Sequence, residues 1–285
     1  MSQFDLTDEQ RQIQEMARQF TADAITPHAG EWDEKHIFPR DTIREAAELG
    51  FGAIYVSEES GGIGLGRLEA ALIMEAMAYG CPSTSAFISI HNMASWMIDR
   101  FGSAEVKQKY LPLMITMEKI GSYCLTEPSS GSDAAALKTK AVLDGGRLNI
   151  GACSLGGAQR CLDEAIAYTK ERKQFGQAIA DFQATQFTLA DMETELQAAR
   201  FLLYVAAAKV TANAPDKTRF AAMAKRLATD TGSSVVDRAL QLHGGYGYLQ
   251  DYPIERFWRD LRVHSILEGT NQIMRVIVSR DLLRQ

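Results

Sequence analysis

The run QLHGGYGY (Gln241–Tyr248) ends a long helical pattern over residues 218–242, and a second run, SILEGTNQ (Ser265–Gln272), follows it. Together the runs place two glycine-bearing turns and one carboxylate, Glu268, near the end of a helix-rich chain. A glycine pair lets the backbone approach a planar or phosphorylated ligand, because no Cβ intervenes. The break after the carboxylate would hold the acid at a helix end, facing a cavity. These runs therefore predict a ligand site built from helix ends.

Helical patterns extend along the chain from these two runs. Thr7 and Gln10 have the spacing of a capping box at the start of a first helix, which Pro27 closes. Apolar periodicity predicts further helices at 41–49, 68–79, 87–101, 104–117, 146–171, 179–212, 218–242, 251–262 and 271–283. Extended structure is expected only over residues 123–125 and 139–143, and two short segments cannot form an independently stable sheet. The sequence therefore predicts an all-α fold.

The composition excludes several classes of protein. The 285 residues are 46% hydrophobic and 23% charged, as in ordinary globular domains. A net charge of −6 disfavours a nucleic-acid partner, because phosphate neutralisation needs a basic face. No apolar run reaches the roughly 18 residues of a membrane span, and the acidic start MSQFDLTDEQ lacks a targeting pattern. Four cysteines without CxxC spacing fit a reducing compartment, so we expect a cytoplasmic protein.

Two other motifs are interpreted as structural. The stretch SGGIGLG (Ser60–Gly66) predicts a loop, because a dinucleotide fingerprint would need glycine where Arg67 stands and a surrounding strand–helix unit. His264 and Glu268 have the spacing of two metal ligands on one helix face, but no third ligand cluster accompanies them. We therefore predict no metal site.

Several motifs, in order, resemble those of the acyl-CoA dehydrogenases. They are LTDEQ, GGIGLGRLEAALIMEAMA, YCLTEPSSGSDAA (Tyr123–Ala135), ERKQFGQAIADFQATQ and the two C-terminal runs. The stretches SAFISIHNMASWMIDRFG and LHGGYGYLQDY are most similar to isobutyryl-CoA dehydrogenases. The resemblance implies a FAD-dependent oxidoreductase that introduces an α,β double bond into a short branched acyl-CoA. It also implies an electron-transferring flavoprotein as partner, and a homo-oligomer that is usually a dimer of dimers.

The resemblance breaks near Val142. The family has a β-barrel-like middle domain between the SGSDAA segment and the GGR helix, whereas here Lys138–Val142 continues directly into Leu143–Arg147. Roughly 100 residues, the size of a small domain, are missing relative to the family. We expect an N-terminal helical domain over residues 1–120, a residual segment over 121–145 and a C-terminal four-helix-bundle domain over 146–285.

The resemblance assigns the catalytic base to Glu268. Burial raises the pKa of a carboxylate and makes it a stronger base, and the hydride leaving the β-carbon needs an electron sink that no side chain provides. Without the neighbouring motifs, Glu268 would be interpreted as a surface acid at a helix end. Likewise, Arg172 would be interpreted as a solvated charge beside Glu171.

The remaining site residues also follow from the resemblance. The flavin ring is expected near Tyr123, Leu125, Thr126 and Ser132. The diphosphate and adenosine are expected to meet Arg172, Phe175, Phe182 and Gln183 from a neighbouring subunit, then Gln241, Gly244 and Gly245 from the other side, and finally Thr270, Asn271 and Gln272. The Arg172 guanidinium suits phosphate binding because two of its N–H groups can bond two phosphate oxygens at once. The CoA substrate is expected at Ser132, Asp144, Arg147 and Gly269. Tyr246, Leu267 and residues 87–91 are candidates for the acyl pocket, although such residues are more often core.

Two functions remain open at this point. The first is the dehydrogenase, with exposed flavin and poorer exclusion of water where the middle domain is missing. The second is a non-catalytic, oligomerising helical remnant with weak or no binding of FAD and CoA. Oligomerisation is expected in both cases, because residues 201–210 and 275–283 are apolar on more than one helix face.

Overall fold

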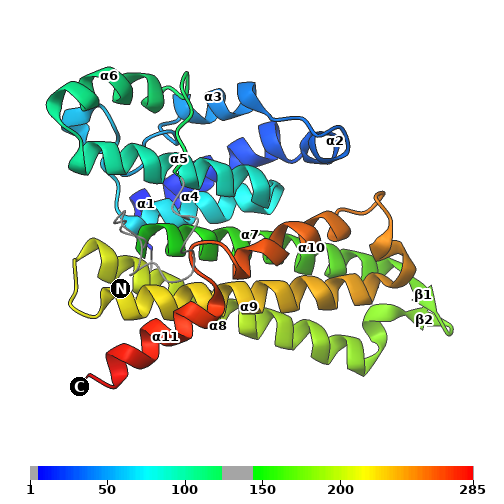
Figure 1. Ribbon diagram of the computed structural model, residues 1–285. Coiled ribbons are helices and arrows are strands. Elements are labelled where there is room, and N and C mark those ends of the chain that lie inside the picture. The colour runs from blue at the N-terminus through cyan, green and yellow to red at the C-terminus, as the bar shows by residue number, and fades with distance from the viewer. Residues whose placement is uncertain (1–5, 124–143, 285) are drawn as a thin grey trace, which may run out of the picture.

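The computed structural model describes residues 6–123 and 144–284, and they are almost entirely helical (Figure 1). The N-terminal half contains α1 (Asp8–Phe20), a π turn (Thr21–Ile25), α2 (Ala29–Glu34), α3 (Arg40–Glu48), a 3-10 turn (Glu58–Ser60), α4 (Arg67–Gly80), α5 (Pro82–Phe101) and α6 (Ala104–Ile115). The C-terminal half contains α7 (Asp144–Glu171), β1 (Lys173–Gln174), β2 (Gln177–Ala178), α8 (Gln183–Thr211), α9 (Lys217–His243), α10 (Ile254–Arg262) and α11 (Asn271–Leu282), with 3-10 turns at Ile179–Asp181, Gly244–Tyr248 and Val263–Ser265. The predicted all-α fold is confirmed.

Side-chain caps fix where several helices begin. The predicted capping box opens α1: the Thr7 hydroxyl accepts from the Gln10 backbone N–H at 3.2 Å, and the Gln10 side chain accepts from the Thr7 N–H at 3.0 Å. Thr270 caps α11 with its hydroxyl, which accepts from the Ile273 N–H at 3.3 Å. Each cap satisfies a backbone donor that has no partner within its helix. The second cap matters for the site, because it ends the turn that carries Glu268.

The helix α7 is the central, buried helix of the molecule. Every residue from Asp144 to Ala158 is buried, because α4, α5, α8, α9 and α10 all pack against this one helix. At Gly156 the backbone of α4 comes so close that a Cβ would lie 2.1 Å from the carbonyl oxygen of Glu75. Glycine at this position therefore allows the two halves to meet, and one hydrophobic cluster runs through both of them.

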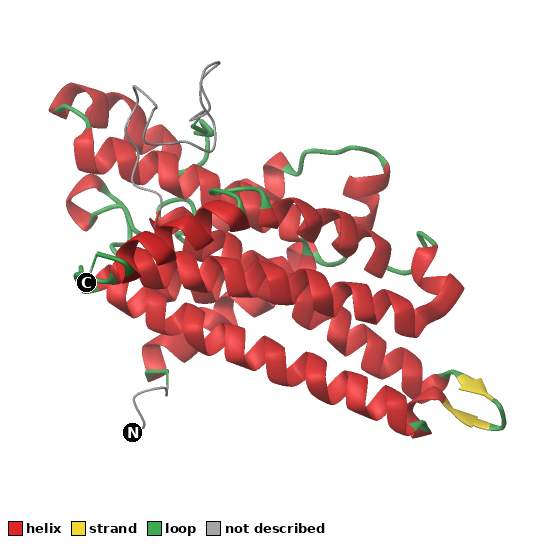
Figure 2. Ribbon diagram, turned by 60° about the horizontal axis from the view of Figure 1, so that its bottom comes forward, coloured by secondary structure: helices red, strands yellow, loops and turns green. Residues whose placement is uncertain are grey.

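A short hairpin between α7 and α8 escaped prediction. Figure 2 shows its two strands at one end of the helical bundle, where Lys173 pairs with Ala178 and Gln174 with Gln177. The turn consists of Phe175 and Gly176, whose φ angles of 53° and 83° are both left-handed, as a tight two-residue hairpin requires. The expected extended segments lie outside the described residues, apart from Tyr123, which is irregular.

Most helix boundaries agree with the predicted ones to within a few residues. The largest difference is at α5, which begins at Pro82 rather than at residue 87, because proline is well suited to a first helical position. The SGGIGLG stretch is a loop with a 3-10 start, as predicted.

Candidate active site

The turn between α10 and α11 holds Glu268 in an unusual backbone conformation. Its φ is 56°, and that of the following Gly269 is 91°. Glycine tolerates this left-handed region readily, whereas a residue with a Cβ enters it at a cost and is most often found there at functional sites. The conformation turns the glutamate side chain back toward the core, onto the first turn of α7.

The two carboxylate oxygens of Glu268 have different surroundings. Oε1 accepts a hydrogen bond of 2.5 Å from the Tyr123 hydroxyl. Oε2 is buried and has no hydrogen-bond partner among the described residues. It lies against Gly146, where a Cβ would come within 2.5 Å of Oε2 and 2.3 Å of the Met93 sulfur. One oxygen is therefore capped, and the other is enclosed but free to accept a proton.

Burial raises the pKa of Glu268 above that of an ordinary glutamate. The hydrogen bond from Tyr123 and the positive charges of Arg147 and Lys225 oppose this effect without cancelling it. Burial, together with the charge of the glutamate, also raises the pKa of Tyr123, so the phenol stays protonated and donates. A carboxylate in this setting is a stronger base than one in water.

The first turn of α7 brings two predicted substrate residues together. Arg147 forms an ion pair of 2.8 Å with Asp144, and both side chains are about nine-tenths buried. The other oxygen of Asp144 accepts from the Thr218 hydroxyl at 2.7 Å. Asp144 is thus fully engaged within the protein, whereas the Nε of Arg147 has no partner in the described part of the chain.

Two residues near this site, Arg67 and Lys225, were not predicted as site residues from the sequence. The Arg67 guanidinium stacks on the ring of Tyr55 at 3.7 Å, beside the first turn of α7. Lys225 of α9 donates to the backbone carbonyl of Gly269 at 2.9 Å. An arginine after a loop and a lysine in an alanine-rich helix are unremarkable as sequence, so only the fold reveals them.

Asn271 and its neighbours begin α11 next to this turn. The Asn271 amide donates to Thr229 at 2.9 Å and to Asp230 at 2.7 Å, and its oxygen accepts from Lys225 at 2.8 Å. A direct contact of this side chain with a cofactor would require breaking these bonds. Thr270 and Gln272 flank it at the start of the helix. We call Tyr123, Asp144, Arg147, Lys225, Glu268 and Asn271 the base cluster.

The other predicted cofactor residues gather at the hairpin, far from Glu268. We call this group the hairpin cluster, and it comprises Arg172, Phe175, Phe182, Gln183, Gln241, Gly244 and Gly245. Phe175 at the hairpin tip is 94% exposed and meets Phe182 edge to face, while Gln183 begins α8. A cavity of about 420 Å³ is lined by Arg172, Gln241, Gly244 and Gly245. Within one chain Arg172 and Gln241–Gly245 line the same cavity, and the expected approach of Arg172 from a neighbouring subunit stays a prediction.

This cavity has the properties of an anion site. The Arg172 guanidinium lies 5.5 Å from the Tyr246 ring and forms no ion pair with a described residue. At Gly244 and Gly245 a Cβ would meet no atom within 4 Å, so the backbone faces open space. A free guanidinium beside accessible backbone fits a diphosphate.

The two clusters lie at opposite ends of the bundle. Lys225 and Gln241 are both on α9, and 16 helical residues correspond to about 24 Å. Figure 1 shows α11 and the hairpin at the two ends of the long helices. Leu125, Thr126 and Ser132 lie outside the described residues.

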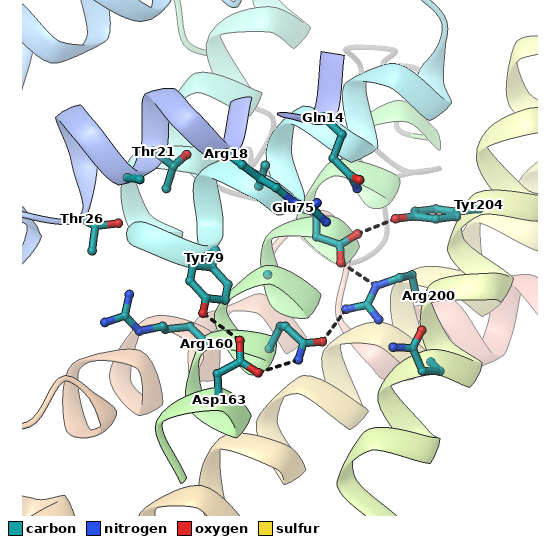
Figure 3. Close-up of a pocket in the computed structure, with 15 residues that line it drawn as sticks. Gln14, Arg18, Thr21, Thr26, Glu75, Tyr79, Arg160, Asp163, Arg200 and Tyr204 are labelled. Carbon is teal, nitrogen blue, oxygen red and sulfur yellow. Dashed lines mark hydrogen bonds and ion pairs between the residues drawn. The ribbon is translucent and has the colours of Figure 1, made fainter. Parts of the chain in front are cut away.

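A larger cavity, of about 690 Å³, lies where α1 and α4 meet α7 and α8 (Figure 3). Glu75 accepts from Arg200 at 2.6 Å and from Tyr204 at 3.0 Å. Asp163 accepts from Tyr79 at 2.7 Å. These hydrogen bonds link the N-terminal half of the chain to the C-terminal half across the cavity. Because both carboxylates are paired, this cavity offers no candidate base comparable to Glu268.

No group of three or more His, Cys, Asp or Glu side chains in residues 6–123 and 144–284 could hold a metal ion. His264 instead pairs with the Ser154 hydroxyl at 2.8 Å inside the core. None of the helices in the same ranges is both long and apolar enough to cross a membrane.

Comparison with known proteins identifies the family. The profile of the acyl-CoA dehydrogenase N-terminal domain matches residues 7–118, and that of the acyl-CoA dehydrogenase C-terminal domain matches residues 136–283. The chain belongs to the acyl-CoA dehydrogenase family. Membership confirms the predicted flavin-dependent oxidoreductase and its cofactor, FAD.

Several individual relatives cover nearly the whole chain. The mitochondrial isobutyryl-CoA dehydrogenase of Dictyostelium discoideum is 42% identical over 373 residues, covering 97% of this chain and 90% of the relative. That of Bos taurus is 38% identical over 98% of this chain and 90% of its own length. Among solved structures, butyryl-CoA dehydrogenase from Megasphaera elsdenii has a TM-score of 0.91 at 27% identity, covering 99% of this chain and all of that one. A chain from a study of the electron transferring flavoprotein of Acidaminococcus fermentans has a TM-score of 0.93 at 32% identity, with 99% and 100% coverage.

Proposed function

We propose that this acyl-CoA dehydrogenase acts on short branched acyl-CoA thioesters of the isobutyryl-CoA type, with Glu268 as the base that removes the α-proton. The observation that carries the assignment is the buried carboxylate in a left-handed turn, with one oxygen, Oε2, that has no hydrogen-bond partner among the described residues. The named isobutyryl-CoA dehydrogenases at 42% and 38% identity support the substrate class.

The residues of the base cluster would prepare the substrate for this step. Burial of Oε2 against Gly146 excludes water from the base. Tyr123 occupies Oε1, so Oε2 would take the α-proton, and the side chains that enclose Oε2 must move for the α-carbon to reach it. Arg147, whose Nε has no partner among the described residues, is our candidate for contact with CoA, while roles for Ser132, Asp144 and Gly269 follow from the resemblance alone.

FAD, when bound, supplies the acceptor for the hydride that leaves the β-carbon. The hairpin cluster fits its diphosphate, because Arg172 and the open Gly244–Gly245 backbone line one cavity. The base cluster is about 24 Å away along α9. We therefore propose that each complete site takes its base cluster from one protomer and its hairpin cluster from another. Exposed apolar side chains on α8 and α11, such as Phe187, Phe201 and Leu282, support a homo-oligomer.

We further propose that the middle β-domain of the family is absent. The alignment to the Dictyostelium relative spans 373 residues, which exceeds the 285 residues of this chain by 88, so at least 88 positions have no counterpart here. The two matching profiles leave only residues 119–135 between them. The absence would expose one face of the flavin ring, weaken its binding and speed its oxidation by oxygen.

The second function, a non-catalytic helical remnant, is favoured by one contact. Tyr123 covers Oε1 of Glu268, so the base is capped by the chain itself. Replacing Tyr123 by phenylalanine separates the two functions, since it removes the cap and one interaction that lowers the pKa of Glu268. An active enzyme should keep flavin and turnover with its pH optimum moved upward, whereas a remnant should gain neither. An electron-transferring flavoprotein as acceptor and a cytoplasmic location remain proposals.

The direct test is the visible spectrum of the protein with FAD, before and after anaerobic addition of isobutyryl-CoA. Bound flavin that bleaches supports the dehydrogenase, and faster bleaching than with n-butyryl-CoA or octanoyl-CoA supports the short branched substrate. Flavin that binds without bleaching would mean that the cofactor site is intact but the chemistry is not. Protein that retains no flavin would overturn the proposal and leave the remnant.

A further inference from the structure

Lys225 is a fully buried lysine in an apolar helix segment. It lies in the stretch FAAMAKRLA of α9, and its exposed fraction is 0%. Burying an ammonium group is costly unless hydrogen bonds and opposite charges compensate. The buried ammonium group of Lys225 therefore needs hydrogen-bond acceptors or opposite charges close to it.

The contacts of Lys225 all lead to the turn that carries Glu268. The Lys225 ammonium donates to the carbonyl oxygen of Gly269 at 2.9 Å and to the side-chain oxygen of Asn271 at 2.8 Å. The carbonyl belongs to the left-handed pair Glu268–Gly269, where the chain leaves regular structure and its polar groups need other partners.

The same helix holds the turn at further points. Thr229 and Asp230, one helical turn beyond Lys225, accept from the Asn271 amide at 2.9 Å and 2.7 Å. Arg275 of α11 donates to the Asn271 carbonyl at 3.1 Å and lies 3.7 Å from Asp230. The turn is thus fastened to α9 on one side, while Gly146 of α7 limits the carboxylate on the other.

We propose that Lys225 is a positioning residue, which holds the Glu268–Gly269 turn so that the carboxylate stays directed at the substrate. This inference rests on the proposed role of Glu268 as the base. Removing Lys225 leaves the Gly269 carbonyl without its ammonium donor and lets the turn relax toward more common backbone angles. The carboxylate would then move away from its place beside Gly146.

The charge of Lys225 acts on the same carboxylate. Burial lowers the pKa of Lys225 to about 8, so the group is still cationic near neutral pH. Asp230 of α9 and Glu268 favour the charged form, and Arg147 of α7 opposes it. In return the ammonium lowers the pKa of Glu268, against the effect of burial. Loss of Lys225 should therefore raise the pKa of Glu268, an effect that simple loss of packing would not produce.

The test is a carboxyl-carbon NMR titration of protein labelled with ¹³C at the glutamate side-chain carboxyl. Glu268→Gln assigns the signal by its disappearance. In the unaltered protein the Glu268 signal should show a second inflection near pH 8, where Lys225 titrates. In Lys225→Met that inflection should vanish and the main midpoint should move to higher pH. Lys209→Met is the matched control, because it removes a lysine of α8 that is bonded to Asp216.

A folded Lys225→Met protein whose Glu268 titration superimposes on that of the unaltered protein would overturn the proposal. If Lys225→Met does not fold, Lys225→Gln, which keeps a donor but loses the charge, must still remove the inflection near pH 8. In turnover, misplacing the base should lower kcat about 100-fold with little change in KM, and a pure rise in KM would contradict positioning. Because the NMR readout needs neither flavin nor acyl-CoA, it stays valid if the chain proves inactive, an outcome that would count against the proposed function alone.

Discussion

At the scale of single residues, Glu268 combines a strained backbone with an enclosed side chain. A left-handed conformation costs a residue with a Cβ on the order of 1–3 kcal/mol and persists only where the surroundings enforce it. Here Lys225 donates a hydrogen bond to the Gly269 carbonyl of the turn. Of the Glu268 oxygens, Oε1 is bonded to Tyr123 and Oε2 lies against Gly146. A helix-end acid on the surface would need none of these contacts. Their combination supports the assignment of Glu268 as a base.

A buried histidine near this turn gives a prediction for pH. Burial, aided by the charge of Lys225, lowers the pKa of His264 from 6.5 to about 4. The folded protein therefore binds this proton less readily than the unfolded chain, so stability is lost as pH falls from 6.5 toward 4. A lowering from 6.5 to about 4 corresponds to about 3 kcal/mol. Urea unfolding at pH 7, 6, 5 and 4 should show this loss, and His264→Gln should flatten it. An equally steep decline in the variant would contradict the assignment.

The sequence predicts Glu268 as the base, but it does not predict the contacts that surround Glu268, for a physical reason. The motif spells out the acid and the glycine turn within a few adjacent positions. Tyr123 and Glu268 are 145 positions apart, and Lys225 reaches Gly269 over 44 positions. Such contacts depend on how the helices pack, and no local spacing encodes that packing. Asn271 illustrates the same limit, since its position was predicted but its internal hydrogen bonds were not.

At the scale of secondary-structure elements, the crossing of α4 and α7 joins the two halves. Only glycine leaves room for the Glu75 carbonyl at this crossing, since a Cβ at position 156 would lie 2.1 Å from the carbonyl oxygen. Gly156→Ala should therefore destabilise the protein by about 1–3 kcal/mol, as overpacking of a core does. Denaturant unfolding measures this loss. Gly30→Ala is the control, because a Cβ there meets nothing within 4 Å, and an equal effect of both substitutions would contradict the account.

The helices of 9 to 29 residues were predictable from the spacing of their apolar residues, whereas the six-residue α2 (Ala29–Glu34) was not predicted. The hairpin at 173–178 was not, since each strand has two residues and no alternation can be read from two positions. The Phe175–Gly176 turn offers a single glycine as a signal, and one glycine is common in loops. The cofactor residues around it were nevertheless assigned from the resemblance.

At the scale of the whole molecule, the two clusters at opposite ends of the bundle predict shared sites. If each site takes Arg172 from one protomer and Glu268 from the other, Arg172→Ala and Glu268→Gln should complement each other. A mixed dimer then contains one site with both groups intact and one site with neither. Purified mixed oligomers, obtained by co-expression with two different tags, should bleach bound flavin at about half the amplitude of the unaltered protein. Mixed oligomers no more active than either variant alone would contradict a shared site.

The most direct measurement of the central claim follows the α-proton itself. The protein with FAD is incubated in D₂O with isobutyryl-CoA, without an electron acceptor. The mass of the recovered isobutyryl-CoA is then measured by mass spectrometry. A base that removes and returns this proton replaces it with deuterium, so the unaltered protein should add one mass unit and Glu268→Gln should add none. Equal incorporation by the two proteins, or no incorporation by either, would contradict the role of Glu268 as the base.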